Sequence, residues 1–243
     1  MIRYLSAAAL LACVGTASAQ FSSVGYQQGD PGGSPDANEY QRDDGVAENS
    51  IGLTAGGSFL WLTRYTSLAA TPLVTNIKVA FGTPLTINGL QADAFIWSDP
   101  NNDGSPADAV VLGTAAGVIS GANPSVPINN PTFVNFNIPD TLTIPGQNFF
   151  IGVRVQHLAG QFPAAIDQTA PLPGPGITWA AFVASPGTVN PNTLGTGQNL
   201  TDFSTLPGLH GDWLIRADAT LIPEPMSLGV FAAAGLLGLR RRR

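Results

Sequence analysis

Apolar and polar residues alternate along much of the chain with the period of two that is typical of β-strands. In the segment 59–65, for example, Phe59, Trp61 and Tyr65 occupy alternate positions. The same alternation predicts further strands at 74–81, 90–97, 110–119, 132–138, 148–156, 177–184 and 213–221. No segment between the two termini has a helical stripe of apolar residues, so we predict an all-β protein.

Turn-forming residues separate nearly all of these segments. The chain contains 28 glycines and 20 prolines, and pairs such as Asn88-Gly89 and Pro145-Gly146 mark points where it reverses. Short strands joined by frequent turns favour an antiparallel β-sandwich with jelly-roll or Greek-key wiring.

The chain divides into a sandwich domain and shorter flanking segments. We predict one sandwich over 39–222, preceded by a flexible polar arm over 20–38. Within the sandwich, 186–211 is rich in Asn, Thr, Gly and Pro and has few large apolar residues. This stretch is therefore expected to be a long surface loop or a poorly ordered insert.

The N-terminus has the three parts of a secretory signal peptide. Arg3 supplies the positive charge, 5–14 forms an apolar core, and Ala17 and Ala19 form an A-x-A cleavage site before Gln20. We therefore predict that the first 19 residues are a signal peptide and that the mature chain is exported.

The single cysteine of the chain, Cys13, lies inside this leader. Cleavage after Ala19 would leave a mature chain without thiols, which excludes disulfides and cysteine-bound metals. The stretch Leu10–Cys13 leaves open the alternative that Cys13 carries a lipid.

The C-terminus combines a rigid acidic triplet, a short apolar span and a basic end. In order these are Pro223, Glu224 and Pro225; the span 226–239; and Arg240, Arg241, Arg242 and Arg243. As a helix the span would be about 21 Å long, shorter than the roughly 30 Å hydrocarbon core of a bilayer. Terminal arginines favour the cytoplasmic side, so we predict a single membrane-spanning helix that retains the chain.

This C-terminal arrangement resembles the PEP-CTERM sorting signal of Gram-negative bacteria, and the likeness covers 223–243. The resemblance implies an exosortase-type processing protease as a partner, with cleavage near the Pro-Glu-Pro triplet. It also implies transient residence in the inner membrane, followed by delivery to the cell surface. Members of this family are commonly linked to extracellular polysaccharide and the biofilm matrix.

The sandwich region also resembles secreted β-sandwich domains of bacterial surface proteins. The residues behind this likeness are Asp43–Gly45, 144–153 and 211–217. The resemblance implies a β-sandwich fold and no particular activity.

The mature region is strongly acidic. Five of the ten basic residues and only one of the sixteen acidic residues fall in the two terminal signals, so five bases face fifteen acids. Such a surface repels nucleic acid, which we do not expect as a partner. It is compatible with cations.

One loop has the residue pattern of a cation site. Asp99, Asn101 and Asp103 place oxygen ligands at alternate positions, Gly104 permits a sharp turn, and Asp108 follows. Oxygen ligands spaced in this way bind hard cations such as Ca²⁺, so these four polar residues are a candidate calcium site.

An EF-hand-like loop would carry an acid at its twelfth position, where this chain has Val110. The alternative is a plain hairpin loop between the strand ending at Trp97 and the strand starting near Ala109, because Asp, Asn, Gly and Pro are common in such loops.

No catalytic motif is evident. The chain lacks a G-x-S-x-G elbow, a P-loop and a dinucleotide-binding glycine motif. His157 and His210 have no partner at metal-ligand spacing and are expected to be polar surface residues. Asp167 lies between apolar runs and is predicted to be a partly buried, hydrogen-bonded, structural carboxylate.

The four tryptophans are candidates for stacking against sugars. Trp61, Trp97 and Trp213 lie in strand segments and are expected in the core, whereas Trp179 is flanked by small residues and should be nearest to solvent. Trp179 is therefore the candidate ligand contact.

The sequence thus predicts an exported, non-enzymatic, structural or adhesive β-sandwich of the cell surface or extracellular matrix. One alternative is a calcium-dependent carbohydrate-binding module that binds exopolysaccharide. Another is a glycan-acting hydrolase, which would require two carboxylates facing each other across a cleft.

Overall fold

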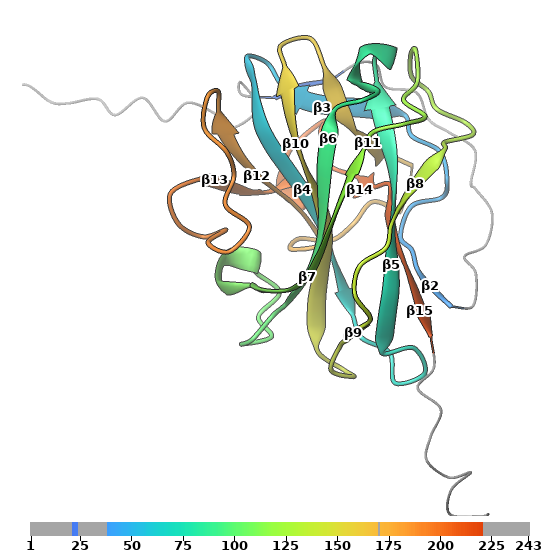
Figure 1. Ribbon diagram of the computed structural model, residues 1–243, viewed down its shortest axis with the longest axis vertical. Coiled ribbons are helices and arrows are strands. Elements are labelled where there is room, and N and C mark those ends of the chain that lie inside the picture. The colour runs from blue at the N-terminus through green and yellow to red at the C-terminus, as the bar shows by residue number, and fades with distance from the viewer. Residues whose placement is uncertain (1–20, 24–37, 170, 221–243) are drawn as a thin grey trace, which may run out of the picture.

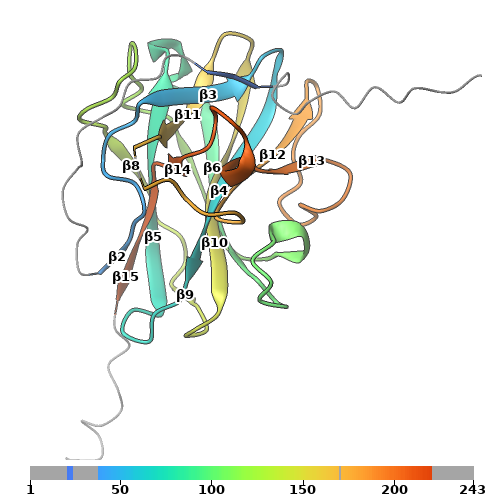
Figure 2. The ribbon, with the colours of Figure 1, turned by 180° about the vertical axis from the view of Figure 1, so that it is seen from behind.

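The computed structural model describes residues 21–23, 38–169 and 171–220. Over these residues the protein is all-β, with two antiparallel sheets that face each other as layers (Figures 1 and 2). The prediction of an all-β antiparallel sandwich is confirmed at this level.

The first layer is a six-stranded sheet. Its strands, in spatial order, are β13 (Asn199–Asp202), β12 (Thr178–Ala184), β4 (Gly56–Thr66), β10 (Asn148–Leu158), β6 (Gln91–Ser98) and β7 (Val110–Val118). The long strand β10 lies between β4 and β6, although it follows them by many residues in the chain. Most contacts in this layer therefore join distant parts of the sequence.

The second layer is a nine-stranded sheet. Its main path is β1 (Phe21–Ser23), β3 (Asn49–Leu53), β11 (Phe162–Asp167), β5 (Leu73–Thr83), β15 (Ile215–Thr220) and β2 (Glu39–Tyr40). Off this path, β14 (Asp212–Trp213) pairs with β11, while β8 (Phe133–Phe136) and β9 (Thr141–Leu142) pair with β5. The described residues also contain three short 3-10 helices: η2 (Leu85–Ile87), η3 (Pro106–Asp108) and η4 (Phe203–Thr205).

The main core fills the space between the two sheets and is rich in aromatic rings. Phe59 and Trp61 of β4 stack at 5.5 Å between ring centroids, and Trp213 packs edge-on against Phe59. These three side chains are fully buried, as expected for aromatic residues on the inner face of a sandwich. The alternate positions of the sequence pattern are thus those whose side chains point inward, into the core between the sheets.

A second apolar cluster covers the outer face of the six-stranded sheet. Leu60, Leu62 and Phe150 point outward from β4 and β10 but are buried, because Val189 and Leu194 pack over them. The strand β4 is therefore buried on both faces, which explains why its alternation separates aromatic from aliphatic residues and not apolar from polar ones.

The prediction of a surface loop or poorly ordered insert at 186–211 is wrong only in part, because 186–198 contain no helix or strand and are mostly exposed, whereas 199–205 form regular elements. This segment contains β13 and η4, and Phe203 is fully buried against Trp213. The few apolar residues of the segment lie far apart in sequence, so no periodic pattern marks them.

The prediction of a flexible arm over 20–38 is wrong for its first residues. Phe21–Ser23 form β1, which pairs with β3, and the ring of Phe21 contacts Phe182 and Phe203. The residues 24–37 lie outside the described part of the chain.

The eight predicted strands are present, but β3 and β11 were not predicted. Their sequences, NSIGL and FPAAID, contain Asn, Ser, Gly, Pro and Ala, which are depleted or weak in strands. The two strands pair with each other, and Gly52 lies so close to the carbonyl of Gln161 that a Cβ would not fit. Close backbone approach is a common reason for glycine in a strand.

The predicted signal peptide 1–19 and sorting signal 223–243 lie outside the described residues. Within the described residues, no helix has the length and apolar character needed to cross a membrane.

Candidate functional site

The candidate cation loop joins β6 to β7, as the sequence predicts. Its backbone turns sharply at Asn102, with φ of 58°, and at Gly104, with φ of 81°. Both angles fall in the left-handed region that asparagine and glycine tolerate best. The short helix η3 follows and carries Asp108 back towards Asp99.

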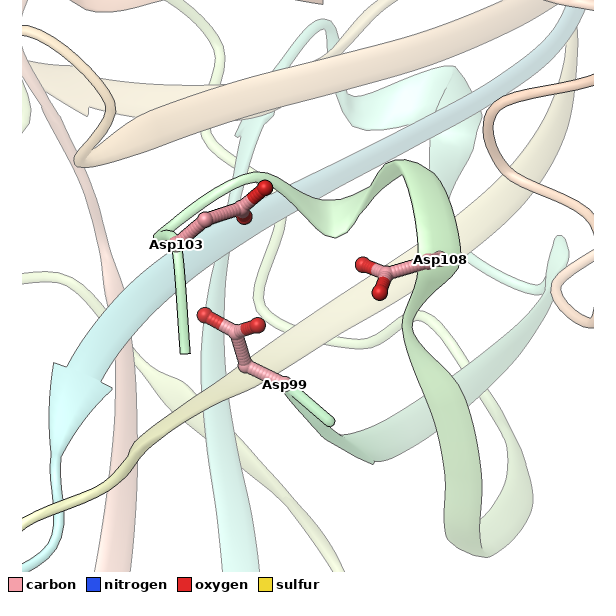
Figure 3. Close-up of side chains that lie close together, drawn as sticks. All are labelled: Asp99, Asp103 and Asp108. Atoms are coloured by element: carbon pink, nitrogen blue, oxygen red, sulfur yellow. The ribbon is translucent and has the colours of Figure 1, made fainter. Parts of the chain in front are cut away.

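The loop gathers three carboxylates. One oxygen from each of Asp99, Asp103 and Asp108 lies within 4.8 Å of the other two, and Figure 3 shows the side chains close together on the loop. Asp103 and Asp108 are exposed, whereas Asp99 is 1% exposed. Three negative charges this close repel one another unless a positive charge lies between them.

One carboxylate oxygen of Asp99 accepts hydrogen bonds and the other does not. Its Oδ2 accepts hydrogen bonds from the Gly104 amide at 2.8 Å and from Asn148 Nδ2 at 3.4 Å. Its Oδ1 is buried and has no hydrogen-bond partner among the described residues. A buried polar atom without a partner is costly, so this oxygen is a candidate ligand atom.

Arg64 is the nearest positive side chain. It lies directly over Gly104, but makes no ion pair with any carboxylate of the described residues. Burial, and then the charge of Arg42, lowers the pKa of Arg64, whereas the charge of Asp99 acts in the opposite direction. Arg64 therefore reduces the negative electrostatic potential of the loop without forming a direct ion pair with its carboxylates.

Asn101 has a different position from the other three predicted ligands. Its Oδ1 accepts a hydrogen bond from the Asp103 amide at 3.0 Å, and its Nδ2 donates to Asp103 Oδ2 at 3.1 Å. Asp103 Oδ1 in turn accepts from the Ser105 amide. Asn101 thus shapes the loop, and the carboxylates offer the converging oxygens.

The loop fits a hard cation such as Ca²⁺. Calcium takes oxygen ligands at about 2.3–2.6 Å, so ligands on opposite sides of the ion are about 5 Å apart. The separations between the three carboxylate oxygens are all within 4.8 Å, which is compatible with three ligands of one such ion. Asp99, Asp103 and Asp108 would be the residues that hold the ion.

The loop contacts the segment that covers the outer face of the sheet. The Gly195 amide donates to the Ala107 carbonyl at 3.1 Å, and Trp97 Nε1 donates to the Pro191 carbonyl at 2.8 Å. These hydrogen bonds link the cation loop and the strand before it to the segment 186–198, so a change in the conformation of the loop can affect that segment.

Trp179 is the only tryptophan of the described residues that is not fully buried, as the sequence predicts. Its ring packs against the outer apolar cluster, and its Nε1 is buried. Trp61, Trp97 and Trp213 are core residues, which confirms that prediction. Trp179 is therefore half-buried, with part of its side chain accessible to solvent.

The prediction that His157 is a polar surface residue is wrong. It is 3% exposed, its Nε2 accepts from the Leu53 amide at 3.1 Å, and burial lowers its pKa. It therefore links β10 to β3 as a neutral side chain. His210 is half-buried, with Nδ1 at 3.1 Å from the Leu206 carbonyl.

Asp167 is buried and hydrogen-bonded, as expected. Its Oδ1 and Oδ2 accept from the amides of Thr169 and Asp44. Burial raises its pKa to about 7, and the neighbouring charges of Asp44 and Glu48 raise it as well. Burial also raises the pKa of Asp212, which pairs with Asp167 in the sheet, to about 6.

A polar hollow that the sequence did not indicate lies beside the end of β12. Its volume is about 340 Å³, and Arg154 is paired with Asp93 inside it at 2.6 Å. The side chains that line it include Gln91, Asp93, Arg154, Gln156, Ser185 and Thr188. Strands β6 and β10 bring Asp93 and Arg154 opposite each other, and no local pattern could show a pair so distant in sequence.

Comparisons with known proteins give weak likenesses. No family model and no curated protein sequence matches the chain. One solved structure, of the cysteine protease and lectin-like domains of Cwp84, a surface layer associated protein of Clostridium difficile, is 12% identical, with a TM-score of 0.47. That match covers 78% of this chain and 37% of the other.

A second structure, of the clostridial cysteine protease Cwp84 after propeptide cleavage, is 10% identical, with a TM-score of 0.46. The match covers 78% of this chain and 42% of that chain. This chain therefore spans less than half the length of either structure.

Gly104→Ala should destabilise the cation loop. A left-handed alanine costs about 1–2 kcal/mol, and its Cβ would also overlap Arg64. Gly146→Ala is the matched control, since Gly146 has the same φ of 81° and no atom within 4 Å of an added Cβ. Calorimetry should show a larger loss of melting temperature for Gly104→Ala, and equal losses would contradict the contact with Arg64.

Proposed function

We propose that this protein is an exported, non-enzymatic β-sandwich of the cell surface or extracellular matrix, structural or adhesive in role, which binds Ca²⁺ in the loop 99–108. The observation that carries the calcium assignment is the buried Asp99 Oδ1, unpartnered within the described residues and next to two further carboxylates. A cation at this point would neutralise the loop and replace the missing hydrogen bond.

Calcium bound here would stiffen one end of the six-stranded sheet. The loop connects β6 to β7, and Asn102 Oδ1 accepts a hydrogen bond from the Asn148 amide at the start of β10 at 2.7 Å. The ion would thereby secure three neighbouring strands. Such stiffening suits a protein that bears load or resists proteolysis outside the cell.

Sorting by the C-terminal signal completes this proposal. The support is the order of Pro223-Glu224-Pro225, the apolar span and the terminal arginines. In this proposal the span holds the precursor in the inner membrane, and an exosortase-type protease releases it for the cell surface. For the released domain we propose jelly-roll or Greek-key wiring, because most neighbouring strands in the two sheets are not consecutive in the sequence.

Carbohydrate binding is the second candidate function, and the polar hollow favours it. Sugars are recognised by side chains that donate and accept several hydrogen bonds, and the hollow presents amides, hydroxyls and an ion pair. Asp93 is the only carboxylate on the lining, whereas glycoside hydrolysis needs two. The hollow therefore supports binding better than hydrolysis.

The cation loop and the hollow are structurally connected. Ser185 and Thr188 line the hollow, and the same segment continues to Gly195, which donates to Ala107 of the cation loop. Loss of the ion would loosen this segment. Glycan binding would then depend on calcium even though the ion does not contact the sugar.

Replacing Asp99, Asp103 and Asp108 together by Asn should remove one bound Ca²⁺ per chain. Equilibrium dialysis against Ca²⁺ measures this number directly. At one hundred times the dissociation constant, the lost stabilisation is about 2.7 kcal/mol, or about 5–10 °C in melting temperature. Asp140→Asn, an exposed acid outside the loop, is the control, and an unchanged number of bound ions in the triple variant would end the loop assignment.

Deleting Arg240 to Arg243 should misroute the protein, because the basic cluster fixes the orientation of the apolar span. Cell fractionation should show less protein at the surface. Replacement of the four arginines by lysines keeps the charge and should preserve delivery. Normal surface delivery of the deletion variant would contradict the sorting proposal.

Gln91→Ala with Gln156→Ala should weaken retention on purified extracellular polysaccharide by about tenfold, through the loss of hydrogen bonds to the glycan. Retention of the parent chain should also fall in EDTA. Asn130→Ala, at an exposed site outside the hollow, is the control. Retention by the double variant equal to that of the parent would exclude the hollow as the glycan site.

A further inference from the structure

The polar hollow beside the end of β12 has the outer face of the six-stranded sheet as its floor. Asp93 of β6 is opposite Arg154 of β10 in the sheet pairing, and Gln156 of β10 is opposite Ser58 of β4. Strands β4, β10 and β6 lie side by side (Figure 1). The floor thus brings polar side chains of three strands together, and the hollow above them has a volume of about 340 Å³.

Hydrogen bonds hold the wall of the hollow against this floor. Ser185 and Thr188 line the wall, and the next residue, Val189, accepts a hydrogen bond from Arg154 Nη1 through its carbonyl at 2.8 Å. The Val189 amide donates to Ser58 Oγ at 3.0 Å. Because the wall is held in this way without a ligand, less of the chain must be ordered on binding.

The positive charge of Arg154 is balanced within the hollow itself. Its Nη2 donates to Asp93 Oδ2 at 2.6 Å, and its guanidinium lies over the ring of Phe95, 5.5 Å from the centroid. The lining has one cation and one anion, so its net charge is zero. An arginine held by Asp93 and Val189 is not free to form the paired hydrogen bonds with which a guanidinium binds a ligand carboxylate.

Asp93 keeps one carboxylate oxygen for a ligand. Its Oδ2 is paired with Arg154, whereas its Oδ1 has no hydrogen-bond partner among the described residues. An ionised carboxylate only accepts hydrogen bonds. A sugar hydroxyl can donate to it, and this charge-assisted hydrogen bond is stronger than a neutral one. A ligand carboxylate at the same place would bring two negative charges together, which is unfavourable.

Four neutral polar side chains of the lining are exposed to solvent and make no side-chain hydrogen bond to another described residue. They are Gln91, Gln156, Ser185 and Thr188. Their amides and hydroxyls both donate and accept hydrogen bonds, as the hydroxyls of a sugar do. The surroundings are acidic, because five basic residues face fifteen acidic residues between the two terminal signals. The electrostatic field of the chain therefore disfavours an anionic ligand.

We propose that the hollow binds a neutral stretch of glycan and rejects uronate sugars, and that Asp93 is the residue that determines this specificity. The inference rests on the carbohydrate binding proposed above and names the class of sugar. Asp93 accepts from a sugar hydroxyl through Oδ1 and keeps Arg154 from binding a sugar carboxylate. Small-molecule pockets range over about 300–1,000 Å³, so a hollow at the lower end of this range contacts only a short stretch of the glycan.

The test measures retention of the purified full chain, in Ca²⁺, on a neutral fraction and a uronate-rich fraction of the extracellular polysaccharide. A third material is the uronate fraction after chemical reduction of its carboxylates to hydroxyls, which removes the charge and keeps the linkages. Retention on the neutral and the reduced material should be at least about tenfold stronger than on the untreated uronate fraction. Added salt should leave retention on the neutral fraction unchanged, because no ion pair with the ligand is screened.

Asp93→Asn should raise retention on the untreated uronate fraction by about tenfold, because it removes the repelling charge and frees Arg154. Retention on the neutral fraction should fall, since the charge-assisted hydrogen bond is lost. Asp140→Asn, an exposed acid outside the hollow, makes the same change in net charge and should leave both retentions unchanged. If calorimetry shows that Asp93→Asn does not fold, the behaviour of the parent chain on the three materials decides the question.

The possible failures are distinguishable. Stronger retention of the parent on the untreated uronate fraction than on the reduced one, falling as salt rises, would overturn the neutral specificity and leave carbohydrate binding intact. An equal gain on the uronate fraction for Asp140→Asn and Asp93→Asn would overturn the role of Asp93. Retention on none of the three materials would overturn carbohydrate binding and this inference with it.

Discussion

The scarcity of positive side chains is the constraint on which the rest of the structure depends. Between the two terminal signals the chain has only five basic residues. Lys78 bridges Glu39 and Asp218, and Arg154 and Arg216 pair with Asp93 and Asp43. The sandwich therefore buries more carboxylates than its own cations can balance. The buried carboxylates of Asp99 and Glu48 have no ion-pair partner among the described residues.

The shortage of positive charge concerns the loops more than the two sheets. The aromatic core between the layers accounts for the sandwich itself, since it needs only the alternation within the strands. The cation loop and the segment 186–198 are held by a few hydrogen bonds around Ala107 and Trp97. Val189 and Leu194 also bury the segment 186–198 in the outer apolar cluster, whereas the cation loop brings its three carboxylates together through polar contacts.

The sequence predicted the features whose determinants lie close together in the chain and missed those that depend on contacts between distant residues. Alternation identified β4, and the pattern of Asp99, Asn101 and Asp103, with Asp108 after them, identified the loop in which three carboxylates converge, because all of these determinants lie within a few residues. Glu48 and Gln168 are bonded across 120 residues, and only the pairing of β3 with β11 brings them together. Phe203 was missed for a related reason, since turn residues surround it and its partners lie in other strands.

The position of the short strand β1 bears on the order of the steps in the proposed export route. Phe21 is inserted among Phe59, Phe182 and Phe203, one residue after Gln20, where the mature chain begins if the leader is cut after Ala19. A protease that binds an extended substrate needs residues on both sides of the cut to be free. In the proposed export route, cleavage of the leader would then precede the docking of β1 against β3.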